Sequence, residues 1–226
     1  AEQEAGENLK SSLPIISRVI DKAVNRINAG GRIIYVGAGT SGRIAAMDAV
    51  EIPCTYGFPE DRILALIAGG VSDAAIEIES EFEEDASAVP EMLMLNIRPE
   101  DVVIGISASA SAYYVQSALA FAKNRSSFSV LIQANIPDKA LPFCDYVIPL
   151  NSGNEVVAGS TRMKAGTATK KVLNFISSSI MIRIGKVVGP YMVDVACVNN
   201  KLVQRAQKIL NILYEINENE ALQMLK

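Results

Sequence analysis

Two segments rich in glycine and serine each follow a predicted buried strand, and their residue types suit the binding of a phosphate group. Residues 37–43 read Gly-Ala-Gly-Thr-Ser-Gly-Arg, and residues 107–112 read Ser-Ala-Ser-Ala-Ser-Ala. Glycine lets a ligand approach the backbone, hydroxyl groups donate hydrogen bonds, and the N-terminus of a following helix favours an anion. A phosphate monoester needs several donors, so we predict that both segments bind one. The predicted binding residues are Gly39, Thr40, Ser41 and Gly42 in the first segment and Ser107, Ser109 and Ser111 in the second.

Other interpretations of these two segments remain open. Gly37, Gly39 and Gly42 match the Gly-x-Gly-x-x-Gly pattern of dinucleotide-binding proteins, but no acidic residue closes the next predicted strand to bind a ribose. The first segment also lacks the Gly-Lys-Ser/Thr ending of a P-loop. A purely structural tight turn needs glycine as well, and Ser111 alone could be the N-cap of a helix.

The sequence contains no histidine, which limits its acid–base chemistry. Without imidazole there is no Ser-His-Asp triad, no histidine-built zinc site and no histidine-assisted opening of a sugar ring. The remaining acid–base candidates are Glu51, close to Pro53, and the acidic run of residues 79–85. A solvated helix end and a solvated helix face are the alternative explanations for these carboxylates. The spacing of the acidic run matches no known cation-binding loop, and we predict neither a metal nor a cofactor.

Composition narrows the class of protein and of partner. The chain has 226 residues, of which 50% are hydrophobic and 20% charged, as in globular rather than disordered proteins. A formal net charge of −4, without a basic stripe, argues against a nucleic-acid partner. The polar first ten residues and the lack of a long apolar run predict neither a signal peptide nor a membrane span. Three widely spaced cysteines indicate a reducing compartment, so we expect a cytoplasmic protein.

Short apolar runs alternate with helical patterns along the chain, which predicts a doubly wound α/β fold with a five-stranded parallel sheet flanked by helices. The predicted strands are residues 32–36, 63–68, 102–106, 128–133 and 146–150. The predicted helices are residues 10–29, 42–50, a stretch from about 72, residues 111–123, and a helical pattern from 162 broken before 217 only by the turn at 189–190. In such a sheet, ligands bind where the strands end and the loops begin, which is where both candidate segments lie.

We expect one domain over residues 1–226, with a core of about 12–185 and a helical extension of about 186–226. The last eight residues begin a helix and stop. This ending predicts the start of a further helical domain in a truncated chain.

Four stretches of the chain resemble the N-acetylmuramic acid 6-phosphate etherase family. They are residues 37–43, 48–57, 66–70 and 159–168, and the last, Gly-Ser-Thr-Arg-Met-Lys-Ala-Gly-Thr-Ala, is the most specific. The resemblance covers roughly residues 12–210. The family belongs to the sugar isomerase (SIS) group and has the glucokinase regulatory protein as a relative. The resemblance implies a SIS fold with flavodoxin-like strand order, a sugar-phosphate ligand, and a homodimer whose sites are completed across the interface.

The resemblance also implies a reaction of cell-wall sugar recycling. The family cleaves the lactyl ether of an open-chain sugar phosphate by elimination and then adds water, using two glutamates. Glu51, in its Glu-Ile-Pro context, matches the first of them. An alignment without gaps places Phe82 at the second position, whereas a two-residue shift brings Glu84 there, and Glu79 matches a preceding acidic position that faces the sugar. Phe can neither donate nor accept a proton, so the second acid is missing if the gapless alignment holds. If the alignment is shifted, the resemblance implies that Glu84 is the second acid, and this is the residue we predict.

The second serine segment departs from the etherase pattern. The family has Ser-Gly-Arg-Thr where this chain has Ser109-Ala110-Ser111-Ala112. The segment instead resembles the regulatory protein, whose corresponding serines hold a fructose phosphate. We predict an etherase-type carbon–oxygen lyase that forms N-acetylglucosamine 6-phosphate and lactate. The alternatives are a non-catalytic sugar-phosphate sensor and a sugar-phosphate isomerase, the latter disfavoured by the absence of histidine.

Overall fold

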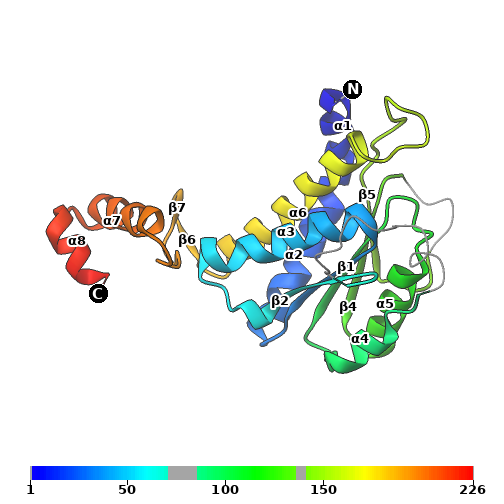
Figure 1. Ribbon diagram of the computed structural model, residues 1–226, viewed down its shortest axis with the longest axis horizontal. Coiled ribbons are helices and arrows are strands. Elements are labelled where there is room, and N and C mark those ends of the chain that lie inside the picture. The colour runs from blue at the N-terminus through cyan, green and yellow to red at the C-terminus, as the bar shows by residue number, and fades with distance from the viewer. Residues whose placement is uncertain (1, 71–85, 136–140, 226) are drawn as a thin grey trace.

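Five parallel strands form a central sheet in the order β2-β1-β3-β4-β5. The computed structural model describes residues 2–70, 86–135 and 141–225 (Figure 1). The strands are β1 (Ile33–Gly37), β2 (Ile63–Ile67), β3 (Val102–Ile106), β4 (Phe128–Gln133) and β5 (Tyr146–Pro149). Every residue of β1, β3 and β4 is buried, which explains their continuous apolar runs. The predicted doubly wound sheet and its flavodoxin-like order are confirmed.

Helices cover both faces of the sheet and enclose a hydrophobic core on each side (Figure 1). One layer consists of α2 (Leu13–Asn28), α3 (Gly39–Tyr56) and α6 (Lys164–Arg183). The other consists of α4 (Val89–Met94) and α5 (Tyr113–Asn124). A short helix, α1 (Glu2–Asn8), leads through a 3-10 turn (Leu9–Ser12) into α2, and a second 3-10 turn (Glu60–Arg62) precedes β2. Glu51 lies in the layer of α2, α3 and α6.

The strand order places the two candidate segments side by side. β1 lies between β2 and β3, so the chain leaves β1 toward one edge of the sheet and returns on its other side to form β3. In the ladder, Gly37 at the end of β1 is opposite Ile106 at the end of β3. Ligands in open α/β sheets bind at this kind of switch point. The topology therefore brings residues 37–43 and 107–112 to one edge of the sheet.

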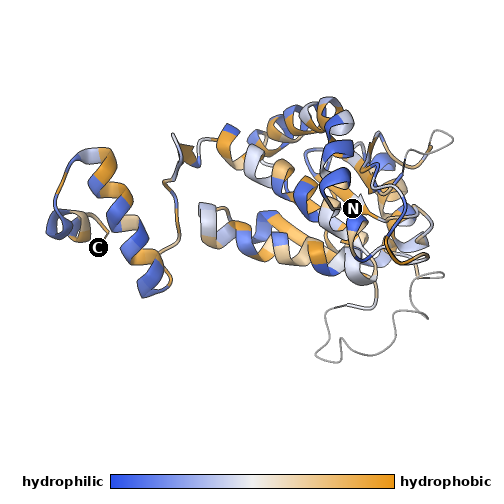
Figure 2. Cartoon of the chain, turned by 90° about the horizontal axis from the view of Figure 1, so that it is seen from above, coloured by the Kyte–Doolittle hydropathy of each residue, from blue (hydrophilic) through white to orange (hydrophobic). Residues whose placement is uncertain are grey.

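The chain beyond α6 differs from the expected helical pattern. Residues 187–192 form a small hairpin of β6 (Val187–Val188) and β7 (Tyr191–Met192), followed by α7 (Asn200–Tyr214) and α8 (Glu218–Met224). Helix α6 ends at Arg183, where Gly185 follows with a positive φ of 86°; Gly189, with a φ of 56°, lies in the turn between β6 and β7. The expectation of nearly unbroken helix from residue 162 is wrong for residues 184–199. Helices α7 and α8 lie at the end of the molecule remote from the sheet (Figure 1). Helix α7 carries both hydrophobic and hydrophilic residues along its length (Figure 2).

No helix within the described ranges combines the length and the apolar character needed to cross a membrane. The expected boundary near residue 186 coincides with the hairpin, and the division into a core and a helical extension remains a prediction.

A buried ion pair joins the starts of β1 and β3. Asp101, which is 0% exposed, accepts hydrogen bonds from Nη2 of Arg32 at 2.6 Å and from the backbone N–H of Arg98 at 2.9 Å. Burial alone would raise the pKa of Asp101. The bonds from the Arg32 side chain and from the backbone of Arg98 and Arg32 outweigh it and hold this pKa below its usual range.

Replacing Asp101 with Asn is expected to lower the free energy of unfolding by about 3 kcal/mol, because Arg32 loses its counter-charge in a mostly buried position. A lowered folded-state pKa stabilises the protein above the usual Asp pKa of about 4, and this contribution is lost as the pH falls through the folded-state value. The difference between wild type and variant should therefore shrink in acid. Urea titrations at several pH values measure the free energy of unfolding of both proteins.

Asp21→Asn is the control, since Asp21 pairs with Arg183 at 2.7 Å on the surface and such pairs contribute less than about 1 kcal/mol. Equal losses of unfolding free energy in Asp101→Asn and Asp21→Asn would contradict the prediction.

Candidate functional site

The first candidate segment forms a tight turn from β1 into α3. Gly39 has a φ of 51°, in the left-handed region that favours glycine. A Cβ on Gly37 would lie 2.6 Å from the backbone nitrogen of Gly42, and one on Gly42 would lie 2.8 Å from the carbonyl oxygen of Gly37. Tight packing of the turn thus accounts for its glycines. It does not account for Thr40 and Ser41, whose hydroxyls stand in the first turn of α3.

The N-terminus of α3 has no side-chain cap. Its N-cap is Ala38, which offers no hydrogen-bond acceptor from its side chain. The first N–H groups of a helix lack partners within the helix, and the helix dipole concentrates partial positive charge there. This turn is therefore built to receive an anion, with the hydroxyls of Thr40 and Ser41 as further donors.

The second candidate segment presents its hydroxyls next to each other. The Oγ atoms of Ser109 and Ser111 are 2.6 Å apart, and both residues are exposed. Ser107 is buried, and its N–H donates to the carbonyl oxygen of Ile132 at 3.1 Å. The N-cap of α5 is Ala112, without a side-chain cap, so Ser111 is not the N-cap that the alternative interpretation required. The exposed Ser109 and Ser111 remain available to a ligand.

Backbone strain accompanies this arrangement. Ala110, between the two exposed serines, has a φ of 60°, which non-glycine residues rarely adopt. The side chain of Gln116 donates to the carbonyl oxygen of Ala110 at 2.8 Å and holds the turn in place. Strained residues of this kind concentrate at ligand sites, where the surrounding structure fixes them.

Glu51 does not lie at the edge where the two segments meet. It follows Gly39 by twelve residues in α3, which corresponds to about 18 Å along the helix axis. Helix α3 runs back along β1 and β2, away from the strand ends. Glu51 therefore does not stand at the open end of the sheet of its own chain, and its catalytic role remains a prediction.

The solvated helix end is also the wrong explanation for Glu51. Pro53 lies inside α3 and does not end it; the helix continues to Tyr56, and Gly57 terminates it with a φ of 58°. The side chain of Glu51 is 62% exposed, yet its carboxylate is 3.3 Å from the ammonium of Lys170 on α6.

Lys170 connects Glu51 to a buried carboxylate that sequence analysis did not single out. Its Nζ lies 3.6 Å from Oδ1 of Asp48. Oδ2 of Asp48 accepts a hydrogen bond from the hydroxyl of Tyr35 at 2.8 Å. The hydroxyl of Ser177 is within hydrogen-bond distance of both Oδ1 of Asp48 (3.3 Å) and the carbonyl oxygen of Leu173 (2.9 Å). Burial raises the pKa of Asp48, opposed by the bond from Tyr35 and the charge of Lys170. Asp48 and Glu51 are three residues apart on one helix and so share a face, but no local pattern points to Lys170 as their partner.

The most specific stretch of the sequence, residues 159–168, forms the start of α6. The carboxylate of Glu155 accepts the backbone N–H groups of Lys164 and Ala165, each at 3.0 Å, and these bonds lower the pKa of Glu155. The ammonium of Lys164 is buried and lies 3.1 Å from a carboxylate oxygen of Glu4. Glu155, which precedes this stretch, therefore caps the N-terminus of α6, and Lys164 ties α6 to α1. Glu79, Phe82 and Glu84 lie outside the described residues.

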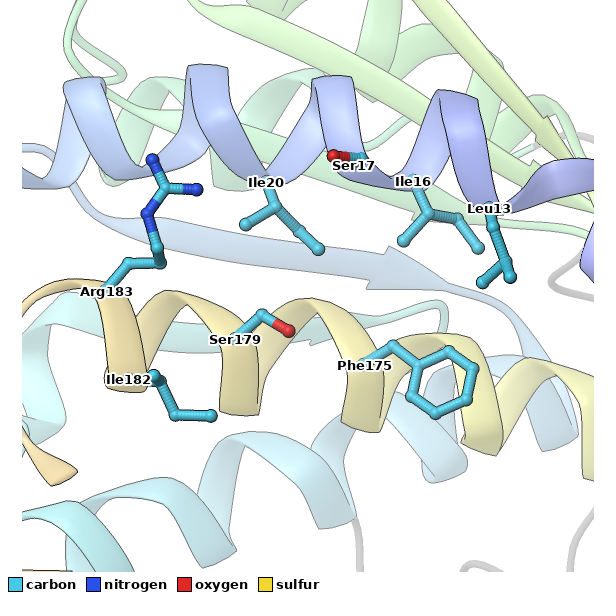
Figure 3. A pocket seen from close by; sticks show the side chains of 8 residues that line it. All are labelled: Leu13, Ile16, Ser17, Ile20, Phe175, Ser179, Ile182 and Arg183. Carbon is cyan, nitrogen blue, oxygen red and sulfur yellow. The ribbon is translucent and has the colours of Figure 1, made fainter. Parts of the chain in front are cut away.

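A hydrophobic groove of about 490 Å³ lies elsewhere, between α2 and α6 (Figure 3). Its apolar side chains are Leu13, Ile16, Ile20, Phe175 and Ile182. It has few polar groups for a phosphate and does not include either serine-bearing turn. Within the described part of the chain, no group of three or more Cys, Asp or Glu is placed to hold a metal ion.

Comparison with known proteins identifies close relatives of the chain. Residues 15–123 match the family described as the glucokinase regulatory protein N-terminal SIS domain. The chain is 37% identical over 212 residues to an N-acetylmuramic acid 6-phosphate etherase of Staphylococcus epidermidis, covering 94% of this chain and 72% of that protein. Proteins of the same name from Lactobacillus acidophilus and Porphyromonas gingivalis are 40% and 38% identical. Those matches cover 93% and 99% of this chain and 71% and 82% of the relatives.

Solved structures share the fold at lower identity. A phosphoheptose isomerase from Francisella tularensis gives a TM-score of 0.56 at 15% identity, over 80% of this chain and 93% of that one. The sugar isomerase domain of an RpiR transcription factor from Sphaerobacter thermophilus gives 0.54 at 19% identity, over 95% and 96%. These neighbours establish a sugar isomerase fold, on which several functions occur.

Proposed function

This chain belongs to the N-acetylmuramic acid 6-phosphate etherase family, and on that basis we propose that it is a carbon–oxygen lyase that cleaves the lactyl ether of N-acetylmuramic acid 6-phosphate. The products are N-acetylglucosamine 6-phosphate and lactate, as in the recycling of cell-wall sugars. The observation that carries the proposal is the meeting of two serine-bearing turns at the ends of β1 and β3, which suits the phosphate of such a substrate.

In this proposal the phosphate binds between the two turns. The backbone of Gly39–Gly42 and the hydroxyls of Thr40 and Ser41 contact it from the start of α3. Ser107, Ser109 and Ser111 contact the same phosphate and the adjoining sugar from the start of α5. The exposed pair of Ser109 and Ser111 supports this placement, as does the uncapped N-terminus of α3.

Ser41→Ala is expected to weaken the binding of N-acetylglucosamine 6-phosphate about tenfold to a hundredfold, because it removes one hydrogen bond to a charged group. Isothermal titration calorimetry measures the dissociation constant. Ser179→Ala is the matched control, since Ser179 lines the groove between α2 and α6. Unchanged affinity in Ser41→Ala, or weakened affinity in Ser179→Ala alone, would move the phosphate site away from the turns.

The reaction needs a base and an acid. The base removes the proton at C2 of the open-chain sugar, and the acid protonates the ether oxygen as the neighbouring carbon–oxygen bond breaks; water then adds to the double bond. We assign Glu51 as the base and Glu84 as the acid, with Glu79 contacting the sugar. These roles derive from the family pattern at the matching positions of this sequence.

Lactate release from N-acetylmuramic acid 6-phosphate tests the proposed function directly. Wild type is expected to release lactate, and Glu84→Gln to lose nearly all of this activity, since an amide cannot donate the proton. Glu81→Gln is the matched control within the same acidic run. Activity retained in Glu84→Gln would eliminate Glu84 as the acid. If wild type binds the sugar phosphate without releasing lactate, then Phe82 occupies the catalytic position and the protein is a sugar-phosphate sensor, the second candidate.

We further propose that the active protein is a homodimer in which Glu51 acts on the substrate held by the partner subunit. Along α3, Glu51 is ten residues from Ser41, about 15 Å. In the substrate, C2 of the sugar is separated from the phosphorus by four carbon–carbon bonds and the phosphate ester linkage. This span is shorter than the distance between Ser41 and Glu51 along α3. One chain therefore does not bring its own Glu51 to the sugar, whereas two chains related by a twofold axis can bring each Glu51 to the other site.

The surface around Glu51 supports this assembly. Met47 and Val50, which flank Glu51 on α3, are 46% and 71% exposed. The neighbouring helix α6 exposes Phe175 and Ile182 beside the groove in Figure 3. Exposed apolar side chains on adjacent helices are typical of an interaction surface. We also propose a cytoplasmic location, because the three cysteines are free rather than paired in disulfides.

A further inference from the structure

A buried glutamine at the end of β4 has an oxygen without a hydrogen-bond partner. Gln133 is the last residue of β4 and is 5% exposed. Nε2 of its side chain donates to the carbonyl oxygen of Asn135 at 2.5 Å. A flipped amide would bring two oxygens together at that contact, so the remaining atom of the amide is the acceptor Oε1. This oxygen is buried and has no partner among the residues that the structure describes.

The sheet places Gln133 next to Ser107, at the edge where the two serine-bearing turns meet. The ladder between β3 and β4 pairs Ile106 with Ile132, so Ser107 and Gln133 stand one step beyond this pair. The hydrogen bond from the N–H of Ser107 to the carbonyl oxygen of Ile132 continues the ladder. Neighbouring strands are about 4.8 Å apart, so Gln133 and Ser107 are adjacent.

Both side chains project from the face of the sheet that α5 covers. Side chains alternate between the two faces along a strand. Leu131, two residues before Gln133, packs in the core cluster that contains the buried residues of α5. On β3, a Cβ on Gly105, two residues before Ser107, would lie 2.6 Å from the side chain of Val115 on α5. Gln133 and Ser107 therefore lie together beneath the turn that leads into α5.

Folding alone does not explain a glutamine at this position. A buried amide oxygen has lost its hydrogen bonds to water, and without a replacement this loss opposes folding. A methionine of similar length would fill the space without that cost, and the carbonyl of Asn135 could bond to water, since Asn135 is exposed. Nearly all buried polar groups in native proteins have a partner. The oxygen of Gln133 therefore calls for a donor that the described part of the chain does not supply.

The chemistry of the missing partner follows from the acceptor character of Oε1. A phosphate at neutral pH presents mainly acceptor oxygens, which repel an amide oxygen, so the phosphate itself does not fit. A sugar hydroxyl is a neutral donor and does fit. In the proposed function the sugar extends from the phosphate past Ser107, which brings its nearest hydroxyl groups to this place.

We infer that Gln133 is a specificity-determining residue, whose Oε1 accepts a hydrogen bond from a sugar hydroxyl close to the phosphate. The two turns then recognise the phosphate, and Gln133 distinguishes a sugar phosphate from other phosphate monoesters. The inference rests on the proposed function for the position of the phosphate between the turns. It depends neither on the identity of the base nor on the release of lactate.

Binding titrations of the intact protein with two ligands test the inference. N-Acetylglucosamine 6-phosphate has hydroxyls near its phosphate, whereas ethyl phosphate is a phosphate monoester without any. Gln133→Met, which removes the acceptor, is expected to raise the Kd of the sugar phosphate about fivefold to tenfold and to change that of ethyl phosphate less than about twofold. The variant should unfold at the same or a higher temperature, because an unpaired buried oxygen is removed. Gln133→Leu should give the same results.

Asn211→Leu is the matched control. Oδ1 of Asn211 is also a buried amide oxygen without a partner among the described residues. Asn211 lies on α7, remote from the sheet (Figure 1). Its replacement should therefore change the Kd of neither ligand. Equal weakening of sugar-phosphate binding by Asn211→Leu and Gln133→Met would overturn the specificity role.

The outcomes distinguish this inference from the proposed function. If Ser41→Ala weakens binding but Gln133→Met does not, the specificity role is wrong, a trapped water satisfies Oε1, and the proposed function stands. If Gln133→Met weakens both ligands equally and lowers the unfolding temperature, Gln133 has a structural role instead. If Gln133→Met weakens only the sugar phosphate while wild type releases no lactate, the specificity role stands and the proposed lyase is wrong. If wild type binds neither ligand, both are wrong.

Discussion

Glu51→Gln is expected to reduce lactate release by a factor of about one hundred or more, while N-acetylglucosamine 6-phosphate binds with nearly unchanged affinity. The amide has the shape of the carboxylate but cannot accept the C2 proton at neutral pH. The position is 62% exposed on its side chain, so the substitution creates no buried unpaired group and should leave folding intact.

Three measurements make this result interpretable. Lactate release reports the reaction, calorimetry reports binding to the turns, and thermal unfolding reports the fold. Glu60→Gln serves as control, since Glu60 is exposed and precedes β2 in a 3-10 turn. Wild-type lactate release by Glu51→Gln, with intact binding, would remove Glu51 from the mechanism.

Mixing two inactive variants is expected to restore activity if each site combines the turns of one subunit with the Glu51 of the other. The first variant, Glu51→Gln, keeps its turns. The second, Ser41→Asp, keeps Glu51 but places a negative charge where the phosphate binds. In a random mixture half of the dimers are mixed, each with one complete site, so about a quarter of wild-type activity should return.

The control for this experiment is a subunit that carries both substitutions. When it is mixed with Glu51→Gln, every site lacks a base and no activity should return. Affinity tags of two kinds show that mixed dimers have formed. Mixed dimers without activity would mean that the turns and Glu51 of the same chain work together, which the length of α3 opposes.

Some features of the site were accessible from the sequence because they depend on local chemistry. The turns at residues 37–43 and 107–112 contain the glycines and serines that a strand-to-helix anion site requires, and parallel topology places them at one edge whatever the details of packing. The strands were also accessible, since burial on both faces leaves continuous apolar runs such as Val102–Ile106.

Other features depended on long-range packing. Pro53 indicated a helix end near Glu51, but α3 continues to Tyr56 because its contacts with β1, β2 and α6 outweigh the hydrogen bond that a proline removes. Glu51 therefore lies within α3, and the length of this helix separates it from the turns.

By itself, the sequence determined the α/β sheet, the two serine-bearing turns and, through its motifs, the etherase family. Only the tertiary structure decided which charges meet. Lys170 and Glu51 are 119 residues apart in the chain and come together because α6 packs on α3. Asp48 is buried only because β1 and α6 both pack against α3 and contact its side chain. Local propensity reports the conformation of a segment, whereas the pairing of distant charges depends on burial that exists only once the segments have packed together.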